Sequence, residues 1–147
     1  MNPARTLCFL LSVLCLAACA SPTLVSGPEE AIRLAAAQPD GVYVQVTMTV
    51  QSTGTGNDSE AGIVFLNSEP DYRSPKSLNI ALSPEIVKQL TSSQKIDPAQ
   101  AFLHRTIRVT GIAKRYPIEF VDGPSAGSFY YQTHLEVHSA DDIQVVE

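Results

Sequence analysis

The segment from Val42 to Gln51 alternates strictly between apolar and polar side chains. Its apolar members are Val42, Val44, Val46, Met48 and Val50; polar Gln45, Thr47, Thr49 and Gln51 come between and after them, and only Tyr43 is ambiguous. A period of two residues is that of a β-strand, whose side chains point alternately to the two faces of a sheet. The pattern therefore predicts a strand with one buried and one solvent-facing side, in a mainly β fold.

Other segments complete a strand-rich pattern. Strands are predicted at 63–66, 78–82, 107–114 and 131–137, with a short terminal one at 143–146. Proline and acidic residues predict a helix from Pro28 to Ala37, a second after Ser83-Pro84-Glu85, and a helical turn at 98–103. Gly111 inside the fourth long strand suggests a bulge or sharp coil. Residues 52–60 and 117–128 are predicted to be loops.

Three strands, a helical connection and two more strands are the order that a five-stranded Greek-key OB barrel requires. Four stretches resemble a group of small bacterial OB-fold proteins: GIVFLN (62–67), LNIAL (78–82), RVTG (108–111) and DDIQVV (141–146). The resemblance spans about residues 42–146. It implies a five-stranded OB-like barrel with a helical connection between strands three and four, preceded by a short N-terminal helix. The loop at 117–128 is longer than the resemblance implies, and a β-sandwich is the alternative.

The first nineteen residues, MNPARTLCFLLSVLCLAAC, have the pattern of an export signal. Arg5 precedes an uncharged apolar run from Leu7 to Ala18. As a helix this run would rise about 18 Å, at ~1.5 Å per residue, which is too short for a hydrocarbon core of ~30 Å. A positive start, a short apolar centre and small residues at the end are typical of a secretory signal.

The end of this run, Leu16-Ala17-Ala18-Cys19, resembles the bacterial lipobox. The resemblance implies that the Cys19 sulfur receives a diacylglycerol, that cleavage follows Ala18, and that the new N-terminus is acylated. Ala20 in place of Asp implies the outer membrane if the source is Gram-negative, with the domain facing the periplasm. The expected organisation is a signal peptide at 1–18, a lipidated tether at 19–27 and an OB-like domain at 28–147.

Composition narrows the possible chemistry. Cys8 and Cys15 lie in the signal and lipid would consume Cys19, so neither a disulfide nor thiol chemistry is expected in the mature domain. On a strand His134 and His138 would stand about 13 Å apart, too far to share one ion, and no metal or cofactor is predicted. The formal net charge of −5 makes long nucleic acid an improbable partner.

OB folds usually bind ligands on the face of strands two and three, between two loops. The loop at 117–128 is framed by aromatic rings and follows a stretch rich in cations. The candidate ligand-binding residues are Tyr116, Phe120, Phe129, Tyr130, Arg108, Lys114 and Arg115. The alternatives are that the rings only close the barrel end and that the cations only cover a solvated strand face.

No nucleophile, phosphate-binding or metalloprotease motif stands in the sequence. The sequence therefore favours a non-enzymatic, membrane-anchored lipoprotein that binds a protein partner or a small anionic or glycan ligand. The alternative is an envelope hydrolase, nuclease-like or acting on cell-wall polymer, built on the same barrel.

Overall fold

The computed structural model describes residues 20–56, 61–95, 97–120 and 123–146. The predicted signal peptide at 1–18 and Cys19, the predicted lipidation site, lie outside these residues. The described strands are β1 (Thr23–Leu24), β2 (Val42–Thr49), β3 (Ser52–Thr55), β4 (Val64–Asn67), β5 (Leu78–Leu82), β6 (Thr106–Glu119), β7 (Phe129–Glu136) and β8 (Ile143–Val145). The helices are α1 (Pro28–Ala37), α2 (Pro84–Gln94) and α3 (Pro98–Ala101), with a 3-10 turn, η2, at Ala140–Asp142.

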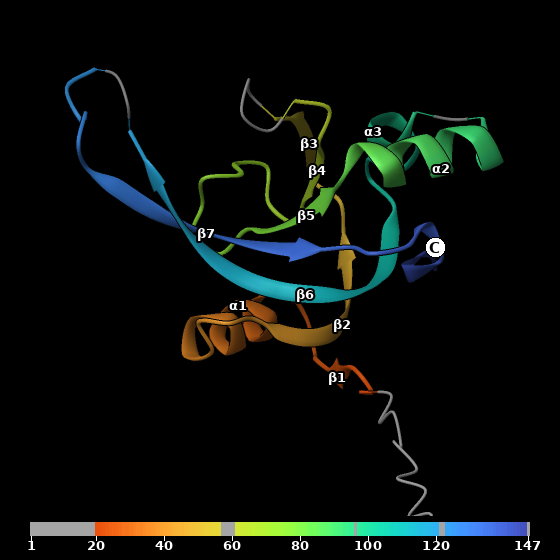
Figure 1. Ribbon diagram of the computed structural model, residues 1–147, viewed down its shortest axis with the longest axis horizontal. Coiled ribbons are helices and arrows are strands. Elements are labelled where there is room, and N and C mark those ends of the chain that lie inside the picture. The colour runs from red at the N-terminus through yellow and green to blue at the C-terminus, as the bar shows by residue number, and fades with distance from the viewer. Residues whose placement is uncertain (1–19, 57–60, 96, 121–122, 147) are drawn as a thin grey trace, which may run out of the picture.

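The strands form one mixed sheet (Figure 1). Its order is β1-β2-β6-β7-β5-β4-β3, with β8 paired to β6, and only the β1–β2 and β5–β7 pairs are parallel. The mainly β class is confirmed, and α2 and α3 connect β5 to β6. The paired path starts at β1 and ends at β3, so the sheet is open where five strands in a closed ring were predicted.

The additional strands have a physical origin. Residues 52–55 were predicted to be loop because Ser, Thr and Gly are typical of turns, and that prediction is wrong. Their backbone pairs with β4 from Ser52↔Asn67 to Thr55↔Val64, so the neighbouring strand supplies the order that their composition lacks. The first predicted strand is thus followed by a second after Val50 and Gln51, and β1 is a further strand that was not predicted, whereas β8 lies within the predicted terminal strand at 143–146.

The alternating segment behaves as its pattern predicts. Val44, Val46 and Val50 are almost fully buried, and β2 pairs with β6 without interruption from Val42↔Ala113 to Thr49↔Thr106. Side chains from α1, α2 and every strand from β4 to β7 complete the core. Its largest fully buried members include Leu66, Leu78, Ile80, Leu82, Leu90, Ile107 and Leu135.

Gly111 stands in a continuous ladder and makes no bulge with β2, where it pairs with Val44. A Cβ atom at this position would lie 2.5 Å from the Cδ2 atom of Leu135 and would also strike the backbone of Glu136. The glycine is therefore required because β7 approaches the backbone of β6 closely at this point.

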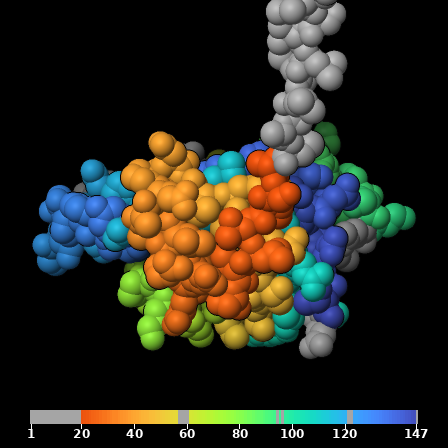
Figure 2. Space-filling model, turned by 90° about the horizontal axis from the view of Figure 1, so that it is seen from below, coloured from red at the N-terminus to blue at the C-terminus, as the bar shows by residue number. Residues whose placement is uncertain are grey.

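The β6–β7 hairpin is longer than the sequence predicts. Pro117, Ile118 and Glu119 belong to β6 and pair with Tyr131, Tyr130 and Phe129. The predicted loop at 117–128 is therefore shorter at its start, and β7 begins at Phe129, two residues before the predicted strand. The hairpin extends past the body of the sheet and curves, with α1 on its convex side (Figures 1 and 2).

The predicted tether at 19–27 contains a short strand. Thr23 and Leu24, which the sequence places in a tether, pair with Val44 and Gln45, and the Val25 N–H donates to the Gln45 carbonyl at 3.1 Å. Figure 2 shows this segment in red beside α1. Among the described helices, none has the length and apolarity needed to cross a bilayer.

Candidate ligand-binding groove

One face of the sheet, opposite the core, carries polar and aromatic side chains. The registers place Asn67 beside Asn79, Asn79 beside His134, and Tyr116 beside Gln132, across strands β4, β5, β7 and β6. We call this surface the polar face. It consists of Ser52, Gly54, Phe65, Asn67, Asn79, Ala81, Tyr116, Ile118, Tyr130, Gln132, His134 and Glu136.

Several polar side chains on this face are buried, which is costly unless hydrogen bonds compensate. The Ser77 hydroxyl donates to Asn79 Oδ1 at 2.6 Å, and Asn79 Nδ2 donates to the Tyr72 carbonyl at 3.3 Å. Asn67 Nδ2 donates to the Ser52 hydroxyl at 3.1 Å. These bonds fix both amides and connect the strands to the segment that contains Tyr72.

One buried atom has no partner within the described residues. Asn67 is 3% exposed, and its Oδ1 atom accepts no hydrogen bond there. A buried acceptor left without a donor costs about 1–3 kcal/mol. Asn67 also belongs to the lining of a groove on the polar face, but the Oδ1 atom itself has almost no exposed surface, so a donor in the groove reaches it only when the atoms that cover it shift.

A chain of hydrogen bonds runs along β7. Gln132 Nε2 donates to the Tyr130 hydroxyl at 2.8 Å, which leaves Gln132 Oε1 as an acceptor. His134 Nε2 lies 2.8 Å from that oxygen and therefore carries the proton. The chain fixes the imidazole and orients the Tyr130 ring.

His134 stands between two aromatic rings. Its ring centre is 5.2 Å from that of Phe65 and 5.1 Å from that of Tyr116. Burial lowers the pKa of the imidazole, while the Glu136 carboxylate acts in the opposite direction. Burial, together with the hydrogen bond that Tyr116 donates to Glu136, raises the pKa of Tyr116 to about 12. The imidazole is thus held neutral, and the phenol keeps its proton at ordinary pH.

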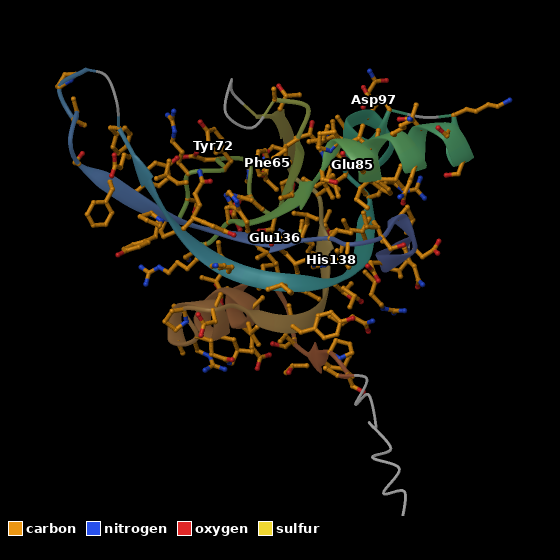
Figure 3. The ribbon with its side chains drawn as sticks, in the orientation of Figure 1. Phe65, Tyr72, Glu85, Asp97, Glu136 and His138 are labelled. Atoms are coloured by element: carbon orange, nitrogen blue, oxygen red, sulfur yellow. The ribbon has the colours of Figure 1, made fainter. Side chains whose placement is uncertain are left out.

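The groove over the polar face has a volume of about 540 Å³. Its walls come from β3, from the segment with Pro70, Tyr72 and Arg73, and from Phe120 and Tyr130 near the hairpin end. A neighbouring hollow of about 450 Å³ shares Phe65 and Ile118 with it and contains Tyr116, His134 and Glu136. Figure 3 shows Tyr72 and Phe65 on the concave side of the β6–β7 ribbon.

Arg73 brings positive charge to one wall. Its guanidinium carbon lies 5.1 Å from the centre of the Tyr72 ring. Tyr72 and a hydrogen bond with Tyr130 raise the pKa of the guanidinium further, and an arginine is charged at every ordinary pH. The groove therefore combines flat rings, amide groups and one cation, and the imidazole of His134 lies in the neighbouring hollow.

The structure brings together part of the predicted binding set. Phe120 and Tyr130 line the groove with ring centres 5.2 Å apart, and Tyr116 lines the neighbouring hollow. Lys114 lies on the same side of β6, with its Nζ atom 5.7 Å from the Tyr116 ring centre. Arg108 is six positions earlier in β6, about 20 Å away along the strand, and pairs with Thr47 and Gln144.

Two other predicted residues lie on the opposite face of the hairpin. Phe129 packs edge-on against Tyr131, with ring centres 5.4 Å apart, and the Arg115 guanidinium carbon is 3.6 Å from the Tyr131 ring centre. Strand alternation separates these residues from Tyr130 and Tyr116. The predicted set therefore divides between two surfaces.

Sequence reasoning missed several residues of the groove. Asn79 lies between the core residues Leu78 and Ile80, and Asn67 follows the core residue Leu66, so their polarity in that pattern was a usable signal. Gln132 lies between Tyr131 and Thr133 and gave no such signal. Tyr72 and Arg73 lie in an irregular segment between β4 and β5, and no local pattern connects them to the hairpin. His134 was considered only as a metal ligand. Within the described residues, no three His, Cys, Asp or Glu side chains are grouped as a metal site requires.

No family model, curated protein or solved structure matches this chain. The chemistry of the groove is therefore the basis for a function. Aromatic faces beside convergent amide groups suit a small ligand with flat apolar faces and several hydroxyl groups.

Proposed function

We propose that the chain is a membrane-anchored lipoprotein whose domain binds a saccharide in the groove, without catalysing a reaction. The observation that carries the proposal is the polar face itself. It places Asn67, Asn79, Gln132 and His134 together on the outer side of a sheet, where each side chain is at least nine-tenths buried. Core packing does not require polar residues there, whereas recognition of hydroxyl groups does.

The aromatic residues support the same ligand class. Phe65, Phe120 and Tyr130 present rings to the groove, and the C–H face of a sugar ring packs well against such surfaces. The groove volume of about 540 Å³ is within the range of ~300–1,000 Å³ usual for small-ligand sites. A short oligosaccharide therefore fits both the size and the chemistry of the groove.

We infer further that the sheet is an OB-like barrel in which β2 and β3 are two parts of one bent strand. Only Val50 and Gln51 separate them. The Val50 N–H donates to the Arg105 carbonyl, just before β6, and the Gln51 N–H to the Asn67 carbonyl in β4, so the bend turns from one neighbouring strand to the other. The parallel β5–β7 pair and the helices before β6 support the same topology. Such barrels bind oligosaccharides and oligonucleotides on this side.

The lipobox supports the proposed anchor at Cys19 in the cell envelope. Two or more acyl chains give the stable attachment that one chain does not. Because β1 starts at Thr23, the anchor would hold the domain close to the bilayer, with the groove facing the periplasm in the proposed Gram-negative outer membrane.

The binding proposal is tested with full-length protein in detergent micelles on an array of neutral and acidic oligosaccharides. We expect saturable binding that Tyr130→Ala abolishes and Tyr131→Ala preserves, because these neighbours on β7 face opposite sides. Release of reducing ends from a bound oligosaccharide would show the hydrolase alternative. No saccharide binding, or equal loss in both variants, would contradict the proposal.

The anchor has its own test. Globomycin, which blocks the lipoprotein signal peptidase, should leave the precursor uncleaved, and Cys19→Ala should remove the protein from the membrane fraction. Mass spectrometry should find a triacylated N-terminal cysteine. A mature protein with an unmodified Cys19 would refute the anchor without affecting the groove.

A further inference from the structure

We infer that the groove takes an acidic saccharide, with its carboxylate at Arg73 and its hydroxyl groups at the amide side chains of the polar face. This inference rests on the proposed function and deepens it. The proposal predicts a saccharide of any charge, whereas the arrangement of Arg73, Tyr130 and Asn67 selects one that carries both an acid group and hydroxyl groups.

Arg73 is the group in the groove that would bind the carboxylate of the ligand. Among the described groove residues it alone bears a permanent positive charge, and no described carboxylate lies within ion-pair distance of it. Tyr72 and Tyr130 hold the guanidinium at the wall. A guanidinium has five N–H donors in a planar fork that matches a carboxylate, and these two tyrosines leave donors free.

Asn67, in the lining of the groove, requires a hydrogen-bond donor, whereas Arg73 requires an acceptor. The buried Oδ1 atom of Asn67 accepts no hydrogen bond from the described residues and needs a donor. An ionised carboxylate or a phosphodiester has only acceptors and cannot provide that bond. A sugar hydroxyl group can donate to Asn67 Oδ1 once the atoms that cover this oxygen shift, because the oxygen has almost no exposed surface. Arg73 and Asn67 together favour a ligand that carries both an acid group and a hydroxyl group.

The charges also argue against a nucleic-acid strand. Glu136 lies in the hollow that adjoins the groove, and Arg73 is the one Lys or Arg side chain among the described groove residues. A strand of phosphates requires a series of cations along its path. One arginine beside a hollow that contains a carboxylate suits a ligand with a single localised acid group.

The test is a calorimetric titration of full-length protein in detergent micelles. The probes are a trisaccharide of galacturonic acid, the matching neutral trisaccharide of galactose, a thymidine trinucleotide and inorganic phosphate. We expect the acidic trisaccharide to bind about tenfold more tightly than the neutral one, as one charge-assisted hydrogen-bonded contact predicts. Phosphate and the trinucleotide should bind more weakly than either trisaccharide.

Arg73→Gln should reduce the affinity for the acidic trisaccharide to that for the neutral one. The matched control is Arg115→Gln, because Arg115 also lies over a tyrosine ring but on the opposite face of the hairpin. It should keep the tenfold preference. Circular dichroism and the thermal midpoint of each variant confirm that the fold is intact.

The outcomes separate the inference from the proposed function. Equal affinity for the two trisaccharides, or an acid preference that survives Arg73→Gln, overturns the inference and leaves saccharide binding in place. Tightest binding of phosphate or the trinucleotide overturns the inference in favour of a different ligand class. Failure of both trisaccharides to bind overturns the inference together with the proposed function.

Discussion

The imidazole of His134 and the phenyl ring of Phe65 lie with their centres 5.2 Å apart, although the strands that carry them are not neighbours. Strand β5 runs between β4 and β7, and there Ala81 pairs with Phe65. Because alanine has only a methyl group, the two rings can meet above it. This contact joins the halves of the polar face into one surface.

Lowering the pH should destabilise the protein through His134. Burial lowers the pKa of the imidazole, so the unfolded chain takes up a proton near pH 6.5 and the folded chain only at lower pH. Glu136 opposes this effect, and Tyr116 and Lys114 complete the ionisable surroundings. The free energy of unfolding should therefore fall as the pH drops below about 6.5, until the pH passes the pKa of the folded state.

Urea unfolding between pH 5 and 8 measures this dependence. His134→Gln should have a smaller slope below pH 6.5 than the wild type, whereas His138→Gln, at an exposed position, should keep the wild-type slope. If His134→Gln shows the same slope as the wild type, the buried imidazole is not the source of the pH dependence of the free energy of unfolding.

Gly111→Ala should destabilise the domain by about 1–3 kcal/mol. The added methyl group would overlap Leu135 and the β7 backbone, which cannot move without disturbing the β6–β7 ladder. Gly54→Ala is the control, because its Cβ would meet no atom within 4 Å, and its effect should be within about 0.5 kcal/mol. Chemical unfolding compares the two. A neutral Gly111→Ala would contradict the close approach of the two strands.

Ala81→Leu should weaken ligand binding. The side chain at this position lines the hollow beside Phe65, His134 and Glu136, so a larger group would fill that space and separate the Phe65 and His134 rings that meet above it. We expect saccharide affinity to fall at least about tenfold, and circular dichroism checks that the fold is intact. Ala99→Leu, in α3 and outside the groove lining, is the control. Unchanged affinity in Ala81→Leu would show that the bound ligand does not enter the hollow.

Most helices and strands lie where the sequence predicts them, because the local sequence signals and the pattern of buried residues indicate the same segments. Helix α1 and strand β5 have their predicted ends, and Ser83 caps α2 as its Ser-Pro-Glu pattern indicates. Strand β3 could not be predicted, because the turn-rich residues 52–55 are ordered by pairing with β4, a contact between segments. The same holds for β1, which depends on β2.

Only part of the candidate site followed from the sequence. Phe120 and Tyr130 were found because aromatic residues cluster in the chain near the hairpin. Phe129 belongs to the same cluster and Arg115 to the cation-rich stretch before it, but alternation along paired strands places both on the other face. Arg73 reaches the groove only through the folding of the segment after β4, which no periodicity describes.

A tryptophan reporter tests the central claim, that the groove is the binding site. The chain contains no tryptophan, so Phe120→Trp in the groove and Phe129→Trp on the opposite face each give a single fluorescence signal. The full-length variants are titrated in detergent micelles with the galacturonic acid trisaccharide. If the saccharide binds in the groove, the emission of Phe120→Trp changes saturably and that of Phe129→Trp stays constant. No change in Phe120→Trp, or equal changes in both variants, would contradict binding in the groove.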